Sequence, residues 1–78
     1  MKRISRGLVQ MNKDVEEVIL SVIDEFSDET GKIAIEDIYR ILKQRYNIDR
    51  ISAGKAIVRL YEKGKIAPIE YYYLRRTD

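Results

Sequence analysis

Residues 46–66, which read YNIDRISAGKAIVRLYEKGKI, carry the strongest signal for the architecture of this chain. Asn47 is a residue type that tolerates the left-handed backbone conformation in which many helices end. Asp49 is a favourable N-cap for a new helix, and Gly64 is suited to end that helix. These residues predict a tight turn followed by a helix over about residues 50–63.

The helix predicted over residues 50–63 has an inner and an outer side. Its apolar residues at helical spacing are Ala53, Ala56, Ile57 and Leu60, and they form the inner stripe. Its outer side keeps Arg50, Ser52, Lys55, Arg59 and Lys63. Ile48 in the preceding turn is expected to fill the gap between the two helices. Gly54 costs about 1 kcal/mol relative to alanine, which tight helix packing or close approach to a flat partner would explain.

Two more amphipathic helices precede the turn. The first follows Asn12, a suitable N-cap, and its apolar positions recur at intervals of three and four residues, with Leu20 at the rim. These positions are Val15, Val18, Ile19, Val22, Ile23 and Phe26. Its acidic residues Asp14, Glu16, Glu17, Asp24 and Glu25 are expected to form a solvated face. Glu36 and Asp37 open the second helix, in which Ile35, Ile38, Leu42 and Tyr46 share one side.

The last segment, KIAPIEYYYLRRTD at residues 65–78, predicts a hairpin. Pro68 blocks a helix, and three consecutive tyrosines favour a strand. The expected strands span residues 65–67 and 71–75 around a turn at 68–70, with KIAI at residues 32–35 as a third strand. We expect the tyrosines to pack the hairpin against the first and third helices, and stacking on unpaired bases is the alternative.

The order of these elements resembles the winged-helix branch of the helix-turn-helix proteins. The resemblance is carried by IAIEDIYRILKQRYNIDRISAGKAIVRLYEKGKI at residues 33–66 and YYYLRR at residues 71–76. Within it, LYEKGKI at residues 60–66 matches the pattern that the family often shows where the recognition helix meets the wing. The resemblance implies an α+β, winged helix-turn-helix domain over residues 13–76, with three helices and a short C-terminal β-hairpin wing. Residues 1–12 would then be an N-terminal arm.

Charge is unevenly distributed along the chain. The net charge is +2 at pH 7, but residues 1–39 carry five basic and nine acidic side chains, whereas residues 40–78 carry ten basic and four acidic ones. This asymmetry suggests a face that binds a polyanion, and an uneven distribution of solvated charges by chance is the alternative.

The resemblance, which extends to compact regulators of archaea, their plasmids and viruses, implies a sequence-specific, double-stranded DNA-binding transcription regulator. Its third helix would enter the major groove, where Arg and Lys pair with guanine. The predicted DNA-contacting residues are Arg50, Ile51, Ser52, Lys55, Arg59, Arg40, Lys43, Lys63, Lys65, Arg75 and Arg76. Ile51 would contact a thymine methyl group unless it belongs to the core. Lys2, Arg3 and Arg6 form either a DNA-tracking arm or a solubilising tail. The wing is shorter than in the family, so minor-groove reading by its tip is not expected.

The composition argues against several classes of function. The chain has no Cys and no His, which removes thiol chemistry and the commonest metal ligands, so we expect no enzyme, cofactor, metal or small-molecule ligand.

One such domain covers one half-site, so a homodimer on double-stranded DNA is expected. No apolar run is long enough to span a membrane and no secretory signal is recognisable, so we expect a cytoplasmic protein. The competing hypothesis is a winged-helix adaptor that binds proteins without binding DNA.

Overall fold

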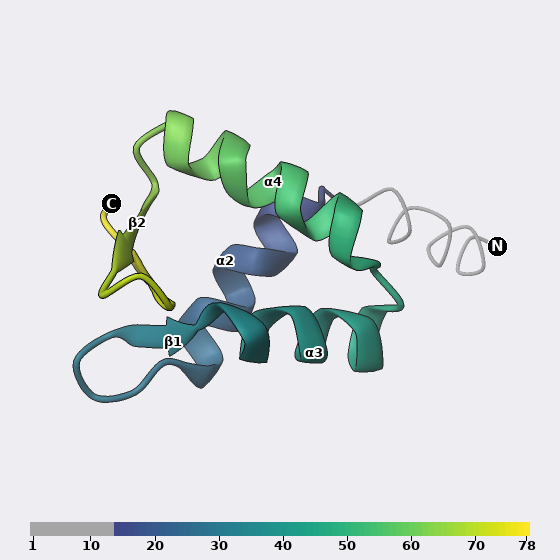
Figure 1. Cartoon of the computed structure of the whole chain (residues 1–78), viewed down its shortest axis with the longest axis horizontal. Helices are drawn as coiled ribbons and strands as arrows, with labels where there is room; N and C mark the ends of the chain where they lie inside the picture. The colour runs from purple at the N-terminus through teal and green to yellow at the C-terminus, as the bar shows by residue number, and fades with distance from the viewer. Residues whose placement is uncertain (1–13) are drawn as a thin grey trace, which may run out of the picture.

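The computed structural model describes residues 14–78, which form three helices and a three-stranded sheet (Figure 1). The helices are α2 (Val15–Phe26), α3 (Ile35–Tyr46) and α4 (Arg50–Glu62), and the strands are β1 (Lys32–Ala34), β2 (Ile66–Ile69) and β3 (Tyr73–Arg76). The strands are antiparallel in the order β1-β3-β2. This arrangement confirms the predicted α+β, winged-helix-like fold. The arm predicted over residues 1–12 lies outside the described residues.

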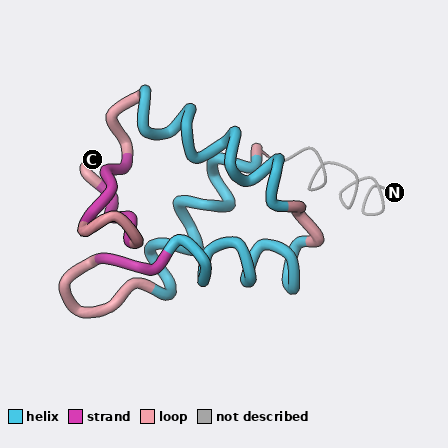
Figure 2. Tube along the Cα trace, viewed as in Figure 1, coloured by secondary structure: helices cyan, strands magenta, loops and turns pink. Residues whose placement is uncertain are grey.

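The elements are arranged so that one side of α4 stays on the outside of the domain. α2 lies between α3 and α4 and packs against both (Figure 1). The sheet lies at one end of the molecule, and the turn between α3 and α4 lies at the other end (Figure 2). α4 therefore runs along one edge of the molecule, from that turn to the wing. No helix within residues 14–78 has the length and apolar character needed to cross a membrane.

The helix ends follow local sequence signals. The side chain of Asp14 caps α2 by accepting a hydrogen bond of 3.0 Å from a backbone N–H in the first turn. The cap is therefore Asp14, whereas the predicted cap Asn12 lies outside the described residues. Asn47 ends α3 in the left-handed conformation (φ 55°), and Asp49 caps α4, both as predicted. Gly64 follows α4 with φ 76°, which confirms its role as the helix stop.

The hairpin turn lies two residues later than predicted. β2 continues through Pro68, so residues 70–72 make the turn in place of residues 68–70. Pro68 is tolerated because β2 is an edge strand of the sheet, where a proline can sit with its nitrogen directed to solvent. Glu70 and Tyr71 adopt φ values of 51° and 67°, and the Tyr72 N–H donates to the carbonyl oxygen of Glu70 at 2.7 Å, which closes the reversal within three residues.

The shifted turn leaves two tyrosines in solvent. Tyr71 and Tyr72 lie on the turn and are 91% and 73% exposed. Tyr73 is half-buried and Leu74 is buried, because the in-and-out alternation of β3 begins only at Tyr73. The expectation that the whole tyrosine run packs the hairpin against the helices is therefore wrong for Tyr71 and Tyr72.

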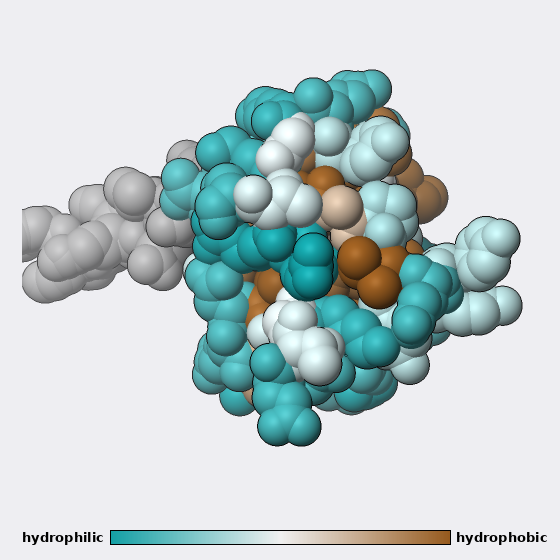
Figure 3. Space-filling view, turned by 90° about the vertical axis from the view of Figure 1, so that its left-hand side faces the viewer, coloured by the Kyte–Doolittle hydropathy of each residue, from teal (hydrophilic) through white to brown (hydrophobic). Residues whose placement is uncertain are grey.

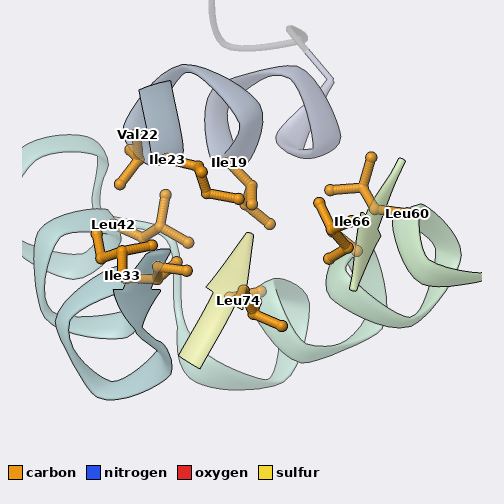
Figure 4. Close-up of a cluster of buried hydrophobic side chains, with 11 residues drawn as sticks. Ile19, Val22, Ile23, Ile33, Leu42, Leu60, Ile66 and Leu74 are labelled. Carbon is orange, nitrogen blue, oxygen red and sulfur yellow. The ribbon is translucent and has the colours of Figure 1, made fainter. Parts of the chain in front are cut away.

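Side chains from the three helices and the sheet form one hydrophobic core (Figure 4). It consists of Ile19, Val22, Ile23, Ile33, Ile38, Leu42, Ala53, Ala56, Leu60, Ile66 and Leu74. Leu20 and Ile48 are half-buried against it, as expected for a rim residue and a gap filler. Ile57, predicted within the inner stripe of α4, is also only half-buried, so it lies at the edge of that stripe. Phe26 is 39% exposed instead of buried, because it is the last residue of α2. The guanidinium of Arg45 lies 5.1 Å from the centre of its ring.

α4 and α3 are in contact at Gly54. A Cβ atom built at this position would lie 3.7 Å from the hydroxyl oxygen of Tyr39, which is an ordinary van der Waals distance. An alanine would therefore fit, and packing on α3 does not require a glycine here.

Candidate nucleic-acid interface

The outer side of α4 is open to solvent from its first residue to the helix stop. The predicted contact residues on or directly after α4 are all exposed: Arg50, Ile51, Ser52, Lys55, Arg59 and Lys63. At the wing end of the molecule, hydrophilic residues surround a small hydrophobic area (Figure 3). Within the described chain, α4 therefore offers a continuous helical surface that the protein itself leaves uncovered.

Apolar side chains share this surface with the charges. Ile51, Val58 and Tyr61 are 72%, 54% and 57% exposed. The sequence reasoning considered Ile51 but missed the other two. Val58 and Tyr61 follow Ile51 by seven and ten residues. This spacing could have placed them on the same side of the helix, because seven residues complete almost two helical turns.

Arg50 is held at the junction between α3 and α4. Its guanidinium donates a hydrogen bond to the carboxylate of Glu36 and lies 4.2 Å from the centre of the Tyr39 ring. The Arg50 side chain nevertheless remains 61% exposed. These two contacts orient the guanidinium toward the α3 flank of α4 without removing it from solvent.

Arg59 and Lys63 are held on the opposite flank of α4 by a carboxylate of α2. Arg59 Nε donates to Glu16 Oε2 and Lys63 Nζ donates to Glu16 Oε1, both at 2.7 Å. The hydrogen bond from Lys63, followed by that from Arg59, holds the pKa of Glu16 below its ordinary value of 4.5. The side chains of Arg59 and Lys63 remain about half exposed, at 49% and 53%.

The expectation that Glu16 belongs to a solvated acidic face is wrong, because Glu16 is only 7% exposed. The spacing of Glu16, Ile19 and Ile23 is that of one helical side, so the position itself points inward. A carboxylate is tolerated there because two cations of the α4 segment meet it.

Candidate residues of α3 meet the start of α4 at a hollow in the surface. The hollow is lined by Glu36, Tyr39, Arg40, Lys43, Asp49 and Arg50. Arg40 Nη1 donates to Asp37 Oδ1 at 2.6 Å, and Lys43 Nζ donates to Asn47 Oδ1 at 3.4 Å. The fold therefore gathers Arg40, Lys43 and Arg50, which lie up to ten residues apart in the sequence, around one hollow.

The candidate residues of the wing have different surroundings. Arg75 is exposed on β3, whereas Lys65 Nζ lies 3.7 Å from the carboxylate of Asp78. Arg76 is half-buried, and its Nη1 donates to Asp24 Oδ2 of α2 at 2.7 Å. Arg76 therefore joins the wing to α2. Arg75 stays open to an external partner.

Across residues 14–78, the candidate cations without a carboxylate partner are Lys43, Lys55 and Arg75. Of these, Lys55 lies on the outer side of α4, between Ile51 and Val58. No protein-family model, curated protein or solved structure matches this chain. Its function is therefore inferred from the fold and from the exposed side chains of α4.

Proposed function

We propose that this protein binds double-stranded DNA with α4 in the major groove and acts as a sequence-specific transcription regulator. The observation that carries this proposal is the open outer side of α4, on which every predicted contact residue is exposed. An α-helix fits the major groove, and an uncovered helix with cations on both flanks suits that position. The winged-helix-like arrangement supports the same orientation of α4.

The proposal includes two copies of the chain on each target. A single α4 reaches only a few base pairs, so a palindromic site with half-sites about 10 base pairs apart would be bound by a homodimer. Sedimentation of the protein on such a duplex measures the number of chains. A complex with one chain on a palindromic site would contradict the dimer and leave the DNA-binding proposal in place.

The test of DNA binding uses Lys55, which makes no ion pair within the described residues. Replacing Lys55→Gln is expected to weaken duplex binding by about fivefold or more, because one charge-assisted contact is lost. Ser21→Glu on the exposed side of α2 alters the net charge by the same amount and is the matched control. Fluorescence anisotropy with a labelled duplex at a fixed salt concentration measures the duplex affinity of both variants. Equal affinity of Lys55→Gln and the wild type would remove α4 as the reading helix.

A second candidate function is a winged-helix adaptor that binds another protein. The exposed Ile51, Val58 and Tyr61 favour it, because apolar residues on one side of a helix also occur at protein interfaces. The adaptor would show no salt-dependent affinity for duplex DNA.

A further inference from the structure

We propose that α4 reads thymine methyl groups, so that the preferred targets are A·T-rich half-sites contacted by Ile51 and Val58. This inference rests on the proposed DNA binding and specifies which base groups are read. It extends the sequence-based expectation, in which Arg and Lys side chains pair with guanine and Ile51 is one possible contact of a thymine methyl group.

The first argument is the position of the side chains around α4. Ile51, Lys55 and Val58 follow one another at intervals of four and three residues, so they form a single line along the helix. This line lies opposite the buried residues of α4, which are Ala53, Ala56 and Leu60. In a helix that enters the major groove with its outer side, the side chains on this line reach the base edges first.

The second argument is that the longest cations are held at the two flanks of α4. Glu36 and Tyr39 of α3 hold Arg50 on one flank, and Glu16 of α2 holds Arg59 on the other. The major groove has a row of phosphates along each of its edges. Cations on both flanks with apolar groups between them therefore match a groove whose edges are anionic. A purely apolar protein partner would not call for cations on both flanks.

The third argument is chemical. The C5-methyl group of thymine is the apolar group that standard bases present in the major groove, and branched aliphatic side chains are suited to contact it. Ile51 and Val58 remain mostly exposed in the free protein, and β-branched residues are only moderate helix formers. The stability of α4 therefore does not explain why these residues occupy its outer line.

Two neighbouring residues define the extent of the contact, since one permits close approach and the other ends it. Gly54 lies between Ile51 and Val58 in the sequence and has no side chain to keep the groove at a distance. Glu62 continues the line four residues after Val58 and is exposed, and its carboxylate repels phosphates. The reading surface therefore covers the first two to three turns of α4 and ends before Glu62.

The test compares thymine with uracil, which lacks only the methyl group. A high-affinity duplex is selected from a random pool, and each thymine is replaced in turn by uracil. We expect about fourfold weaker binding for each contacted thymine, the effect of burying one methyl-sized group. Ile51→Ala and Val58→Ala are expected to abolish this difference at one position each. Lys55→Ala is the matched control. It should weaken binding to the thymine and uracil duplexes equally and so preserve the ratio of the two affinities.

The possible results separate this inference from the proposed function. Tight, salt-dependent duplex binding with no effect of uracil, or selected sites rich in G·C, would overturn methyl reading and leave DNA binding intact. No salt-dependent duplex binding would overturn the proposed function itself. Because Ile51 and Val58 are exposed, their alanine variants should keep the thermal stability of the wild type, which circular dichroism verifies. If Ile51→Ala abolishes self-association and leaves duplex affinity unchanged, the apolar line is a protein interface and the inference is wrong.

Discussion

Glu16 links α2 to the candidate recognition helix, α4. Its carboxylate is buried against α4 and accepts hydrogen bonds from Arg59 and Lys63. Removing such a partner leaves the remaining charges without their counterion in a partly desolvated position, which destabilises the fold. The same contact fixes where these two cations lie relative to the outer line of α4.

Replacing Glu16→Gln is expected to lower the thermal midpoint at pH 7 by on the order of 5 °C. The pKa of Glu16 is lower in the folded than in the unfolded state, so its stabilisation is present above the ordinary value of 4.5. This stabilisation is lost as the pH falls through the folded-state pKa. The gap in thermal midpoint between wild type and variant should therefore narrow as the pH falls below 4.5 and close once Glu16 is protonated in the folded state. Melting curves from pH 3 to 8 measure this, and Glu29→Gln in the exposed loop is the control. A gap that is independent of pH would contradict this role of Glu16.

Gly54→Ala is expected to raise the free energy of unfolding by about 1 kcal/mol, because alanine favours the helix and its Cβ would meet only the Tyr39 hydroxyl at 3.7 Å. Gly64→Ala is the matched control. Its positive φ of 76° strains any side chain, so it should destabilise by about 1 kcal/mol. Urea denaturation measures both. A loss of stability in Gly54→Ala would show that α3 and α4 pack more closely than the structure indicates.

Among the elements, the hairpin has the least favourable local sequence. Its turn places Glu70 and Tyr71 in left-handed conformations that Asn and Gly adopt at lower cost. The hairpin is held by pairing with β1, in which Ile33 lies opposite Leu74, and by the hydrogen bond from Ile35 N to Tyr72 O at 2.8 Å. Tertiary pairing therefore stabilises a turn that the local sequence disfavours.

Tyr71→Gly should stabilise the protein by about 0.5–1 kcal/mol, because glycine adopts φ 67° without steric cost and the 91% exposed tyrosine contributes little packing. Tyr72→Gly makes the same chemical change where φ is not positive, and it is expected to be neutral or destabilising. Chemical denaturation of the two variants side by side tests the assignment. Stabilisation by Tyr72→Gly alone would mean that the turn lies one residue later.

In the whole molecule, part of the charge imbalance between the two halves of the sequence is neutralised internally. Carboxylates of the acidic first half meet cations of the basic second half, in the pairs Glu16–Arg59, Glu16–Lys63, Asp24–Arg76, Glu25–Arg45 and Glu36–Arg50. The excess of basic residues after position 39 is therefore only partly available to a polyanion. Counting charges along the sequence overstates the positive potential of the surface.

If the protein binds duplex DNA as proposed, this partial neutralisation should limit the salt dependence of that binding. Three candidate cations have no carboxylate partner in the described chain, and Arg50 and Arg59 are paired but half exposed. A plot of log affinity against log salt concentration should then have a slope between about −3 and −5, since each neutralised phosphate contributes about −0.9. Titrations at four or more salt concentrations measure it. A slope near zero would contradict phosphate contacts by this surface.

Much of the fold could be predicted because its signals are local. The caps at Asn47, Asp49 and Gly64 act through backbone groups a few residues away, and the inner stripes follow from helical spacing alone. The third strand, β1, was also predicted, since the hairpin needed a partner. The exposure of Lys55 followed from the same spacing, because residues opposite a buried stripe face solvent. For Ile51, the sequence left both an exposed and a core position open, and the structure shows it exposed.

Contacts between distant segments decided where the hairpin turns, why Glu16 is buried and which cations have a carboxylate partner. β2 extends through Pro68 because it pairs with β3 at an edge, which moves Tyr71 and Tyr72 into solvent. Glu16 is buried because α4 brings two cations to it from more than forty residues away. Hydrophobic spacing and capping act within a few residues, so the chain sequence specifies its helices and their inner sides. Ion pairs and strand ends depend on which segments meet in space, so they are set when the core assembles.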